Sequence, residues 1–379
     1  MKIPLQARHR SSGLNTQFSG NGLSFGEYIQ QTEAMLRRVH AGKPDIEKIV
    51  AGNVPFALQP SGAFQKGIGK PYRRGVLLTH GLSDSPYHMR HLGEFFQRNG
   101  FRVMAVLLPG HGTQPGDLLG VRWEDWAAAV AYGVQSLVEE VDDVYLAGFS
   151  AGAALSLLQA NEDERVQGVF LFSPALKIAT RARWAHLRRL YSWLLPRSAW
   201  LNLLPDQDPY KYESFCMNAV TQMWRLTLAL PQAELSIPVF VVASADDATV
   251  ISAAALEFIK KVRHPARKML WYAADDPKQE DVEWVKSALP ERRILSSAHT
   301  AVVIPPDDAH YGESGEYANC LHYFAQDGAH YSACRASQAA WLGEVTPQNL
   351  KYGLLRRLMY NPHYAGMEAA MRRFIERLS

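Results

Sequence analysis

The chain has 379 residues, of which 47% are hydrophobic, and its formal net charge is +3 at pH 7. This length suits one large α/β domain with an insertion, or two domains, and the apolar fraction supports a sizeable core. The small charge and the absence of any basic-aromatic cluster argue against a nucleic-acid partner. No apolar run reaches the length of a transmembrane helix, and no HExxH or paired histidine spacing indicates a metal site.

The first 70 residues are predicted to form an N-terminal arm and a docking helix. Residues 1–21 are polar and contain no apolar stretch of the signal-peptide type, which predicts a cytoplasmic location while leaving export open. Residues 11–26 are rich in Ser, Gly and Asn, which favours an extended arm. Residues 25–40 have the apolar periodicity of an amphipathic helix.

Two buried strands with characteristic loops come next. Residues 75–79 (GVLLT) form an apolar run that leads into HGLSDSP at 80–86, and a helix is predicted at 87–98. A second apolar run at 101–108 ends in PGHG at 109–112. Strands that alternate with helices in this way predict a parallel sheet with helices on both faces.

Residues 148–152 read GFSAG and match the pattern GxSxG. A buried strand is predicted at 144–147 and a helix that begins with small residues at 151–160, so Ser150 lies at a strand-to-helix corner. Such a corner lifts the serine hydroxyl above the sheet, and glycines flank it because a Cβ there would collide with the backbone. Ser150 is therefore the candidate nucleophile. The alternative is a glycine-rich turn with an incidental serine.

Together these motifs resemble the alpha/beta-hydrolase superfamily, and within it the lid-bearing monoglyceride lipases, carboxylesterases and lysophospholipases. The resemblance extends over residues 74–250. It implies an α/β fold whose mostly parallel central sheet, with helices on both faces, is formed by residues 71–176 and 237–379. Residues 177–236 would then be an inserted lid.

The resemblance also implies an oxyanion hole made by the backbone N–H groups of Leu82 and Ala151. Attack on an ester carbonyl creates an alkoxide that needs preplaced donors, and the loss of one donor costs about 3 kcal/mol. His80 and His111 lie in the loops that follow the first two strands. We expect them to orient these loops and not to act as bases.

Substrate preference is expected to come from the predicted lid. Residues 177–200 contain several Lys and Arg residues and no acidic residue, and helical spacing separates them from an apolar face that includes Trp184, Tyr191 and Trp193. This helix either packs on the core with a solvated basic face or touches an anionic lipid surface. In both cases the apolar face would cover the active site, which favours a hydrophobic ester such as a monoacylglycerol or a lysophospholipid.

The acid of a triad in this fold follows the serine and precedes the histidine. A buried strand at 238–242 runs into the adjacent Asp246 and Asp247, and only one of them can face the site. In related lipases the acid commonly lies nine positions after the proline that opens this strand, here Pro238. That spacing selects Asp247 and leaves Asp246 as the second choice, with a helix following at 253–262.

Of the thirteen histidines, only those beyond the acid fit the chain order. His299 lies in a run at 293–302 that predicts a strand followed by a small-residue loop, a setting that resembles the catalytic loop of the family. His310, in a polar turn, is the second choice. The gap between acid and base is longer than usual in the family, and a strand at 268–272 and an acidic stretch at 275–283 are predicted to fill it as an insertion.

The resemblance therefore implies a serine ester hydrolase that needs no cofactor. His299 would take the proton of Ser150 and pass it to the leaving alcohol, and Asp247 would orient the imidazole. Water would then release the acyl group. A thioesterase, acyltransferase or peptidase of the same fold remains an alternative, as does a non-hydrolytic binding protein.

The remaining features lie towards the C-terminus. The chain has three cysteines, and free thiols are expected in a cytoplasmic protein. Cys320 and Cys334 are close enough in sequence to form a disulfide if the protein is exported. Helices are predicted at 348–359 and 366–378.

Overall fold

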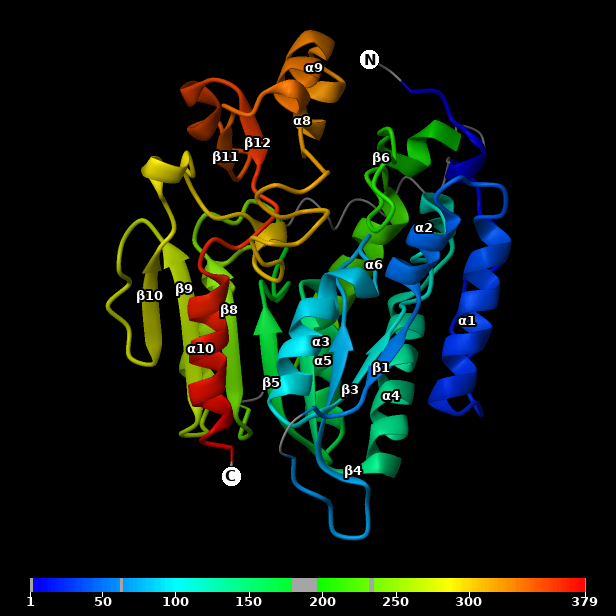
Figure 1. Ribbon diagram of the computed structural model, residues 1–379, viewed down its shortest axis with the longest axis vertical. Helices are drawn as coiled ribbons and strands as arrows, with labels where there is room; N and C mark the ends of the chain where they lie inside the picture. The colour runs from blue at the N-terminus through cyan, green and yellow to red at the C-terminus, as the bar shows by residue number, and fades with distance from the viewer. Residues whose placement is uncertain (1–2, 62–63, 179–195, 232–234, 379) are drawn as a thin grey trace. The chain divides into compact units, whose positions relative to one another are not determined.

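The computed structural model describes residues 3–61, 64–178, 196–231 and 235–378 (Figure 1). The chain divides into two compact units. The larger unit comprises Ile3–Phe170 and Ala179–Ala233, and the smaller unit comprises Met1–Lys2, Leu171–Ile178 and Glu234–Ser379.

The sheet of the larger unit contains the three strands that the sequence predicted, which are β2 (Tyr72–Thr79), β3 (Arg102–Val106) and β4 (Val141–Phe149), and two further strands, β1 (Phe56–Leu58) and β5 (Val166–Phe172). Its neighbouring strands are, in order, β1, β3, β2, β4 and β5. Strand β2 runs parallel to both β3 and β4, whereas β1 is antiparallel to β3. The buried halves of β2 and β4 lead directly to the two loops that carry the motifs HGLSDSP and GFSAG.

Helices connect and cover these strands. They are α1 (Phe25–Val39), α2 (Ile46–Asn53), α3 (Arg90–Arg98), α4 (Trp123–Glu140), α5 (Ala151–Glu162) and α6 (Met217–Ala229). Helix α4 buries Trp126, Val130 and Val134, which recur on one helical face. Helix α1 begins at a capping box in which Ser24 accepts a hydrogen bond from the backbone of Glu27. The docking helix predicted at 25–40 is therefore present.

The smaller unit contains three parallel strands, β8 (Val239–Ser244), β9 (Arg267–Ala273) and β10 (Val282–Lys286). Helix α7 (Ala253–Lys261) follows β8. Helix α10 (Tyr364–Ile375) lies beside β8, and the ring centroids of Phe240 in β8 and Phe374 in α10 are 5.3 Å apart (Figure 1). The C-terminal part adds α8 (Leu321–Phe324), α9 (Gly328–Ala336) and the parallel pair β11 (Trp341–Gly343) and β12 (Leu355–Arg357).

Shorter elements complete the structure. Strands β6 (Trp200–Asn202) and β7 (Phe215–Cys216) form an antiparallel pair. Single turns of 3₁₀ helix occur at Ala7–His9, Pro86–Met89, Pro115–Leu119, Pro196–Ala199, Pro290–Arg292, His299–Ala301 and Asn349–Tyr352. Within the described ranges, no helix combines the length and the apolar character that crossing a bilayer requires.

Three sequence predictions need correction. Residues 268–272 and 275–283 are not an insertion, because the first lies in β9 and the second leads into β10, which pairs parallel to β9. The strand expected at 293–302 is reduced to bridges at Ile294, because the next residues turn into a 3₁₀ helix. The helix expected at 348–359 stops early, because Gly353 adopts a φ of 113° and the chain then extends into β12.

The lid predicted at 177–236 is described only in part. Trp184, Tyr191 and Trp193 lie outside the described residues, together with most of the basic stretch. The described remainder of the segment includes β6, β7 and α6.

Candidate active site

Ser150 occupies a strained corner between β4 and α5. Its backbone angles are φ 55° and ψ −111°, a combination that non-glycine residues rarely adopt. The helix begins at once, since the carbonyl oxygen of Ser150 accepts hydrogen bonds from the amides of Ala153 and Ala154 at 3.1 and 3.2 Å. Strain of this kind persists only where surrounding packing imposes it, and it is concentrated at functional sites.

The packing that imposes this corner involves the two glycines of the motif. A Cβ on Gly152 would lie 2.1 Å from the carbonyl oxygen of Thr79, the last residue of β2. A Cβ on Gly148 would lie 2.3 Å from the carbonyl carbon of Gly152. Only glycine allows these approaches, which place the start of α5 against the end of β2 and the loop that follows it. That loop contains Leu82, the other residue expected to supply an oxyanion donor.

His80 fixes the start of this loop through both ring nitrogens. Its Nε2 accepts a hydrogen bond from the amide of Leu108 at 3.1 Å, so Nδ1 carries the proton and lies 2.8 Å from the carbonyl oxygen of Gly81. Burial lowers the pKa of His80 well below its ordinary value, and nearby His111 lowers it further. The ring is therefore neutral, and it joins the end of β2 to the loop after β3.

His111 plays the same part from the loop after β3. Its Nε2 accepts from the amide of Ser83 at 3.0 Å, and its Nδ1 lies 3.0 Å from the carbonyl oxygen of Pro109. Burial lowers the pKa of His111 to about 4. Both histidines thus orient loops and have both ring nitrogens engaged with the backbone.

A further clamp on the loop after β2 was missed from the sequence. The amide of Tyr212 donates to the carbonyl oxygen of Ser83 at 2.8 Å, and the Lys211 ammonium pairs with Asp84. Burial opposes ionisation of Asp84, but the charge of Lys211 outweighs it and brings its pKa to about 2. No motif marks these residues, because they lie more than a hundred positions from the loop that they hold.

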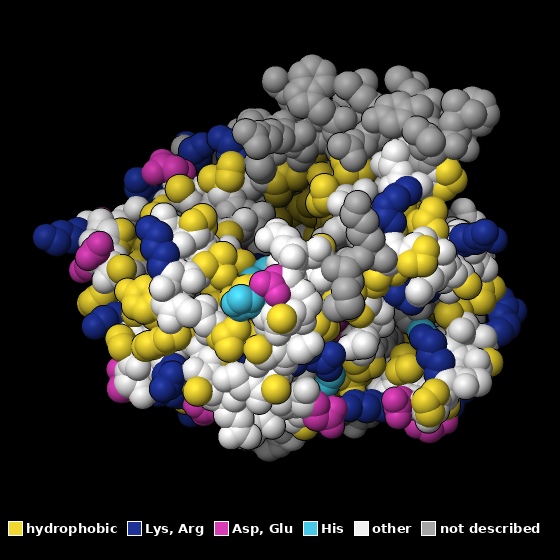
Figure 2. Space-filling model, turned by 90° about the horizontal axis from the view of Figure 1, so that it is seen from above, with side chains coloured by type: hydrophobic (Ala, Val, Ile, Leu, Met, Phe, Trp, Pro, Cys, Tyr) yellow, Lys and Arg dark blue, Asp and Glu magenta, His cyan; other side chains and the backbone are white. Residues whose placement is uncertain are grey.

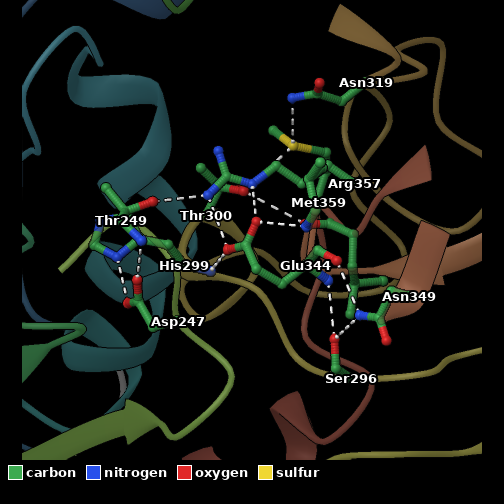
Figure 3. A network of polar contacts seen from close by, with 12 residues as sticks. Asp247, Thr249, Ser296, His299, Thr300, Asn319, Glu344, Asn349, Arg357 and Met359 are labelled. Atoms are coloured by element: carbon green, nitrogen blue, oxygen red, sulfur yellow. Dashed lines mark hydrogen bonds and ion pairs between the residues drawn. The ribbon is translucent and has the colours of Figure 1, made fainter. Parts of the chain in front are cut away.

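In the smaller unit, Asp247 and His299 form a buried pair (Figure 3). The Nδ1 atom of His299 lies 2.5 Å from Oδ2 of Asp247, and both side chains are at most 5% exposed. The other oxygen, Oδ1, accepts from the amides of Thr249 and Val250 at 2.8 and 3.0 Å. Burial raises the pKa of Asp247, but the neighbouring His299 and these amides lower it to below its ordinary value. An ionised carboxylate thus lies against Nδ1 of the imidazole.

The two second-choice residues have other partners. Asp246 accepts a hydrogen bond from the amide of Ser297 at 3.1 Å, and burial raises its pKa above the ordinary value. The Nδ1 atom of His310 lies 3.6 Å from Glu316, and its ring stacks on Tyr317 with the ring centroids 5.5 Å apart. The structure therefore brings the side chains of Asp247 and His299 together, whereas Asp246 binds the backbone two residues before His299 and His310 packs against its own loop.

Glu344 is another residue that sequence reasoning missed. Its Oε2 accepts a hydrogen bond from the backbone amide of His299 at 3.2 Å, across 45 positions of sequence. A carboxylate in an irregular C-terminal segment gives no sequence signal of such a contact. Over the part of the chain that the structure describes, no group of three or more His, Cys, Asp or Glu side chains could hold a metal ion.

Comparison with known proteins identifies the family of the chain. The model of the family described as serine aminopeptidase, S33 matches residues 70–274, more than half of the chain. A thermostable monoacylglycerol lipase from Bacillus sp. (strain H-257) is 33% identical over 104 residues, which are 27% of this chain and 42% of the relative. A carboxylesterase from Bacillus subtilis (strain 168) is 32% identical over 85 residues, 22% of this chain and 35% of the relative. The chain thus spans less than half the length of these curated relatives.

Solved structures of lipolytic enzymes are also similar. One of two metagenome-derived lipolytic enzymes is 24% identical, with a TM-score of 0.48, and the match covers 58% of this chain and 87% of that one. The monoacylglycerol lipase of Paleococcus ferrophilus is 18% identical, with a TM-score of 0.45 and coverage of 59% and 92%. The family match and the order of the strands confirm the fold predicted from the sequence: the chain belongs to the serine aminopeptidase S33 family and has the alpha/beta-hydrolase fold.

Proposed function

We propose that the protein is a serine hydrolase that cleaves carboxylic esters through an acyl-serine intermediate. The observation that carries the proposal is the buried hydrogen bond of 2.5 Å between Asp247 and Nδ1 of His299. A carboxylate on this nitrogen fixes the tautomer in which the opposite nitrogen acts as a general base. Ser150, at the strained corner that precedes α5, is the nucleophile in this proposal.

The proposed mechanism gives each residue one task. His299 removes the proton of Ser150 as the hydroxyl attacks the ester carbonyl, and the amides of Leu82 and Ala151 stabilise the resulting alkoxide. His299 then protonates the leaving alcohol while Asp247 stabilises the imidazolium. A water molecule, activated in the same way, releases the acyl group and restores the serine.

We propose hydrophobic esters, such as monoacylglycerols or lysophospholipids, as the substrates. The names of the two Bacillus relatives support ester cleavage. In Figure 2, Lys and Arg side chains of the described residues are scattered among hydrophobic ones over the face shown. The lid at 177–236, with its apolar residues over the site and a transient contact with a lipid surface, is part of this proposal.

A peptidase is the second candidate, because the matching family is described as serine aminopeptidase. Both activities use the acyl-serine step and differ in the leaving group. Hydrolysis of p-nitrophenyl esters from acetate to palmitate should be compared with hydrolysis of aminoacyl p-nitroanilides. We expect ester turnover that rises with chain length, and faster cleavage of the anilides would favour the peptidase.

The nucleophile is tested with the Ser150→Ala variant and a fluorophosphonate probe. The wild-type protein should be labelled, and the variant should be unlabelled and inactive although its circular dichroism spectrum is unchanged. Ester turnover that survives in Ser150→Ala would remove the proposed function, and so would a well-folded wild-type protein that resists the probe.

The location of the protein is also a proposal. The sequence predicted the cytoplasm, but Cys320 and Cys334 form a disulfide, and Cys216 is free and buried. Disulfides persist mainly in oxidising compartments, so the pairing favours export over the cytoplasm. Fractionation of cells, with thiol-blocking before lysis, measures both the compartment and the oxidation state of the pair.

A further inference from the structure

The loop of His299 is held by a buried carboxylate from the C-terminal segment. Glu344 directly follows β11 and is 1% exposed. Its Oε2 accepts from the backbone amide of His299 at 3.2 Å, and its own amide donates to Oγ of Ser296 at 2.9 Å. His299 is the first residue of a 3₁₀ turn, where the amide has no partner within the helix. Glu344 supplies that partner and thereby fixes the backbone from which the imidazole projects.

Arg357 joins this carboxylate to the turn of Asp247 (Figure 3). Its Nη2 donates to Oε2 of Glu344 at 2.9 Å and to Oγ1 of Thr249 at 2.8 Å, and its Nε lies 2.9 Å from Oε1 of Glu344. The amide of Thr249 in turn donates to Oδ1 of Asp247 at 2.8 Å. One planar guanidinium therefore connects the turn that carries the acid with the carboxylate that holds the base.

We propose that Glu344 and Arg357 are positioning residues that set the Asp247–His299 pair, an inference that rests on the proposed function. Asp247 and His299 are 52 positions apart, so the hydrogen bond between them depends on how two separate loops are held. A displacement of about 1 Å at reacting groups can lower a rate about 100-fold. The side chains of Arg357 and Glu344 are 22% and 2% exposed, and an ion pair of this kind is weak evidence for stability, so its effect is sought in the geometry of the Asp247–His299 pair.

The neighbouring arginine provides a matched control. Arg356 and Arg357 are adjacent in β12, so their side chains leave the strand on opposite sides. Arg356 donates to the carbonyl oxygens of Cys334 and Arg335 at the end of α9, both at 2.9 Å, and to that of Ser337. Its loss removes as many contacts as the loss of Arg357 without touching the acid-base pair.

The experiment measures kcat and KM for a p-nitrophenyl ester in four variants, Arg357→Met, Arg357→Lys, Glu344→Gln and Arg356→Met. Both oxygens of Glu344 face N–H donors, so the NH2 group of a glutamine would meet a donor in either orientation. We expect Arg357→Met and Glu344→Gln to lower kcat about 10- to 100-fold with KM changed less than about twofold. Lysine keeps the charge but cannot reach Glu344 and Thr249 together, so Arg357→Lys should recover part of kcat. Arg356→Met should retain the wild-type kcat.

A spectroscopic signal separates positioning from activity. The Nδ1 proton of His299 should give a downfield NMR resonance, identified by its loss in Asp247→Asn. This resonance should shift or broaden in Arg357→Met and Glu344→Gln and stay in place in Arg356→Met. If the resonance and kcat are both unchanged in Glu344→Gln, the positioning role is overturned while the proposed function stands. If Arg357→Met does not fold, Glu344→Gln and Arg357→Lys still test the positioning role.

The proposed function can fail separately. If the wild-type protein hydrolyses no ester, or if Ser150→Ala hydrolyses esters equally well, then ester cleavage at Ser150 is wrong. The NMR resonance still tests the positioning role in that case, since it reports the Asp247–His299 hydrogen bond directly. Equal effects of Arg356→Met and Arg357→Met on the resonance would show only a general role in stability and would overturn the inference.

Discussion

The corner of Ser150 and the pair of Asp247 and His299 are built in contrasting ways. The corner depends on two glycines, each two residues from the serine, whose missing Cβ atoms allow backbone to meet backbone. The pair depends on side-chain contacts over 45 and 52 positions, with Glu344 at one end. A steric requirement on neighbouring residues leaves a motif in the sequence, whereas a requirement satisfied by distant side chains leaves none.

The largest expected effect lies at the acid-base pair. Asp247→Asn should lower kcat about 10⁴-fold, because an amide cannot hold the productive imidazole tautomer or stabilise its cation. Asp246→Asn should lower kcat far less, since Oδ2 of Asp246 accepts a hydrogen bond from the backbone amide of Ser297, and the side-chain oxygen of asparagine can accept it too. Ester hydrolysis by both variants tests the ranking, and the reverse order would show that Asp246 is the acid.

The corner should break sterically. In Gly152→Ala the new Cβ would meet the carbonyl oxygen of Thr79 at 2.1 Å, and backbone cannot give way as a flexible side chain can. We expect a loss of about 4 kcal/mol in the free energy of unfolding, measured with urea. Gly120→Ala is the control, because nothing lies within 4 Å of the added Cβ, and a loss as large there would contradict the steric explanation.

The two buried histidines, His80 and His111, should make the stability of the folded protein depend on pH. The pKa of His111 is lowered from 6.5 in the unfolded chain to about 4 by burial, and that of His80 is lowered in the same direction. The unfolded chain therefore binds more protons between these values, so stability is full above pH 6.5 and falls as the pH drops towards 4. His111 alone should account for about 3 kcal/mol of this loss.

Urea unfolding at neutral and at acidic pH measures this effect. His111→Asn removes the titrating group, so the difference between the two conditions should shrink by most of that amount. A variant whose stability falls with pH as steeply as that of the wild type would show that other groups cause the acid sensitivity.

The smallest effect concerns the C-terminal segment that carries Glu344 and Arg357. Cys320 and Cys334 are 14 positions apart, and a loop of this size stabilises the folded state by about 2 to 3 kcal/mol. The Cys320→Ser/Cys334→Ser variant should show faster amide exchange around α8, α9 and β12, while β4 and α5 exchange as in the wild type. Faster exchange at the Ser150 corner as well would mean that the disulfide stabilises the whole chain.

The sequence by itself determined the elements that depend on residues close together in the chain. The apolar runs of β2, β3, β4 and β8 and the amphipathic helix α1 appeared where periodicity placed them. The GFSAG corner appeared because Gly148 and Gly152 lie where the backbone approaches too closely for a Cβ. Alternation of strands and helices then fixed the parallel topology.

Tertiary structure decided the rest, because long-range contacts override weak local preferences. Strand β10 became part of the sheet through its pairing with β9, although its residues resembled an acidic insertion. The strand β12 formed against β11 where the pattern favoured a helix. Of two adjacent aspartates, the spacing from Pro238 selected Asp247, and the structure places it beside His299. The contacts of Glu344 and Arg357 with the two loops had no counterpart in any motif, because they join residues 45 and 108 positions apart.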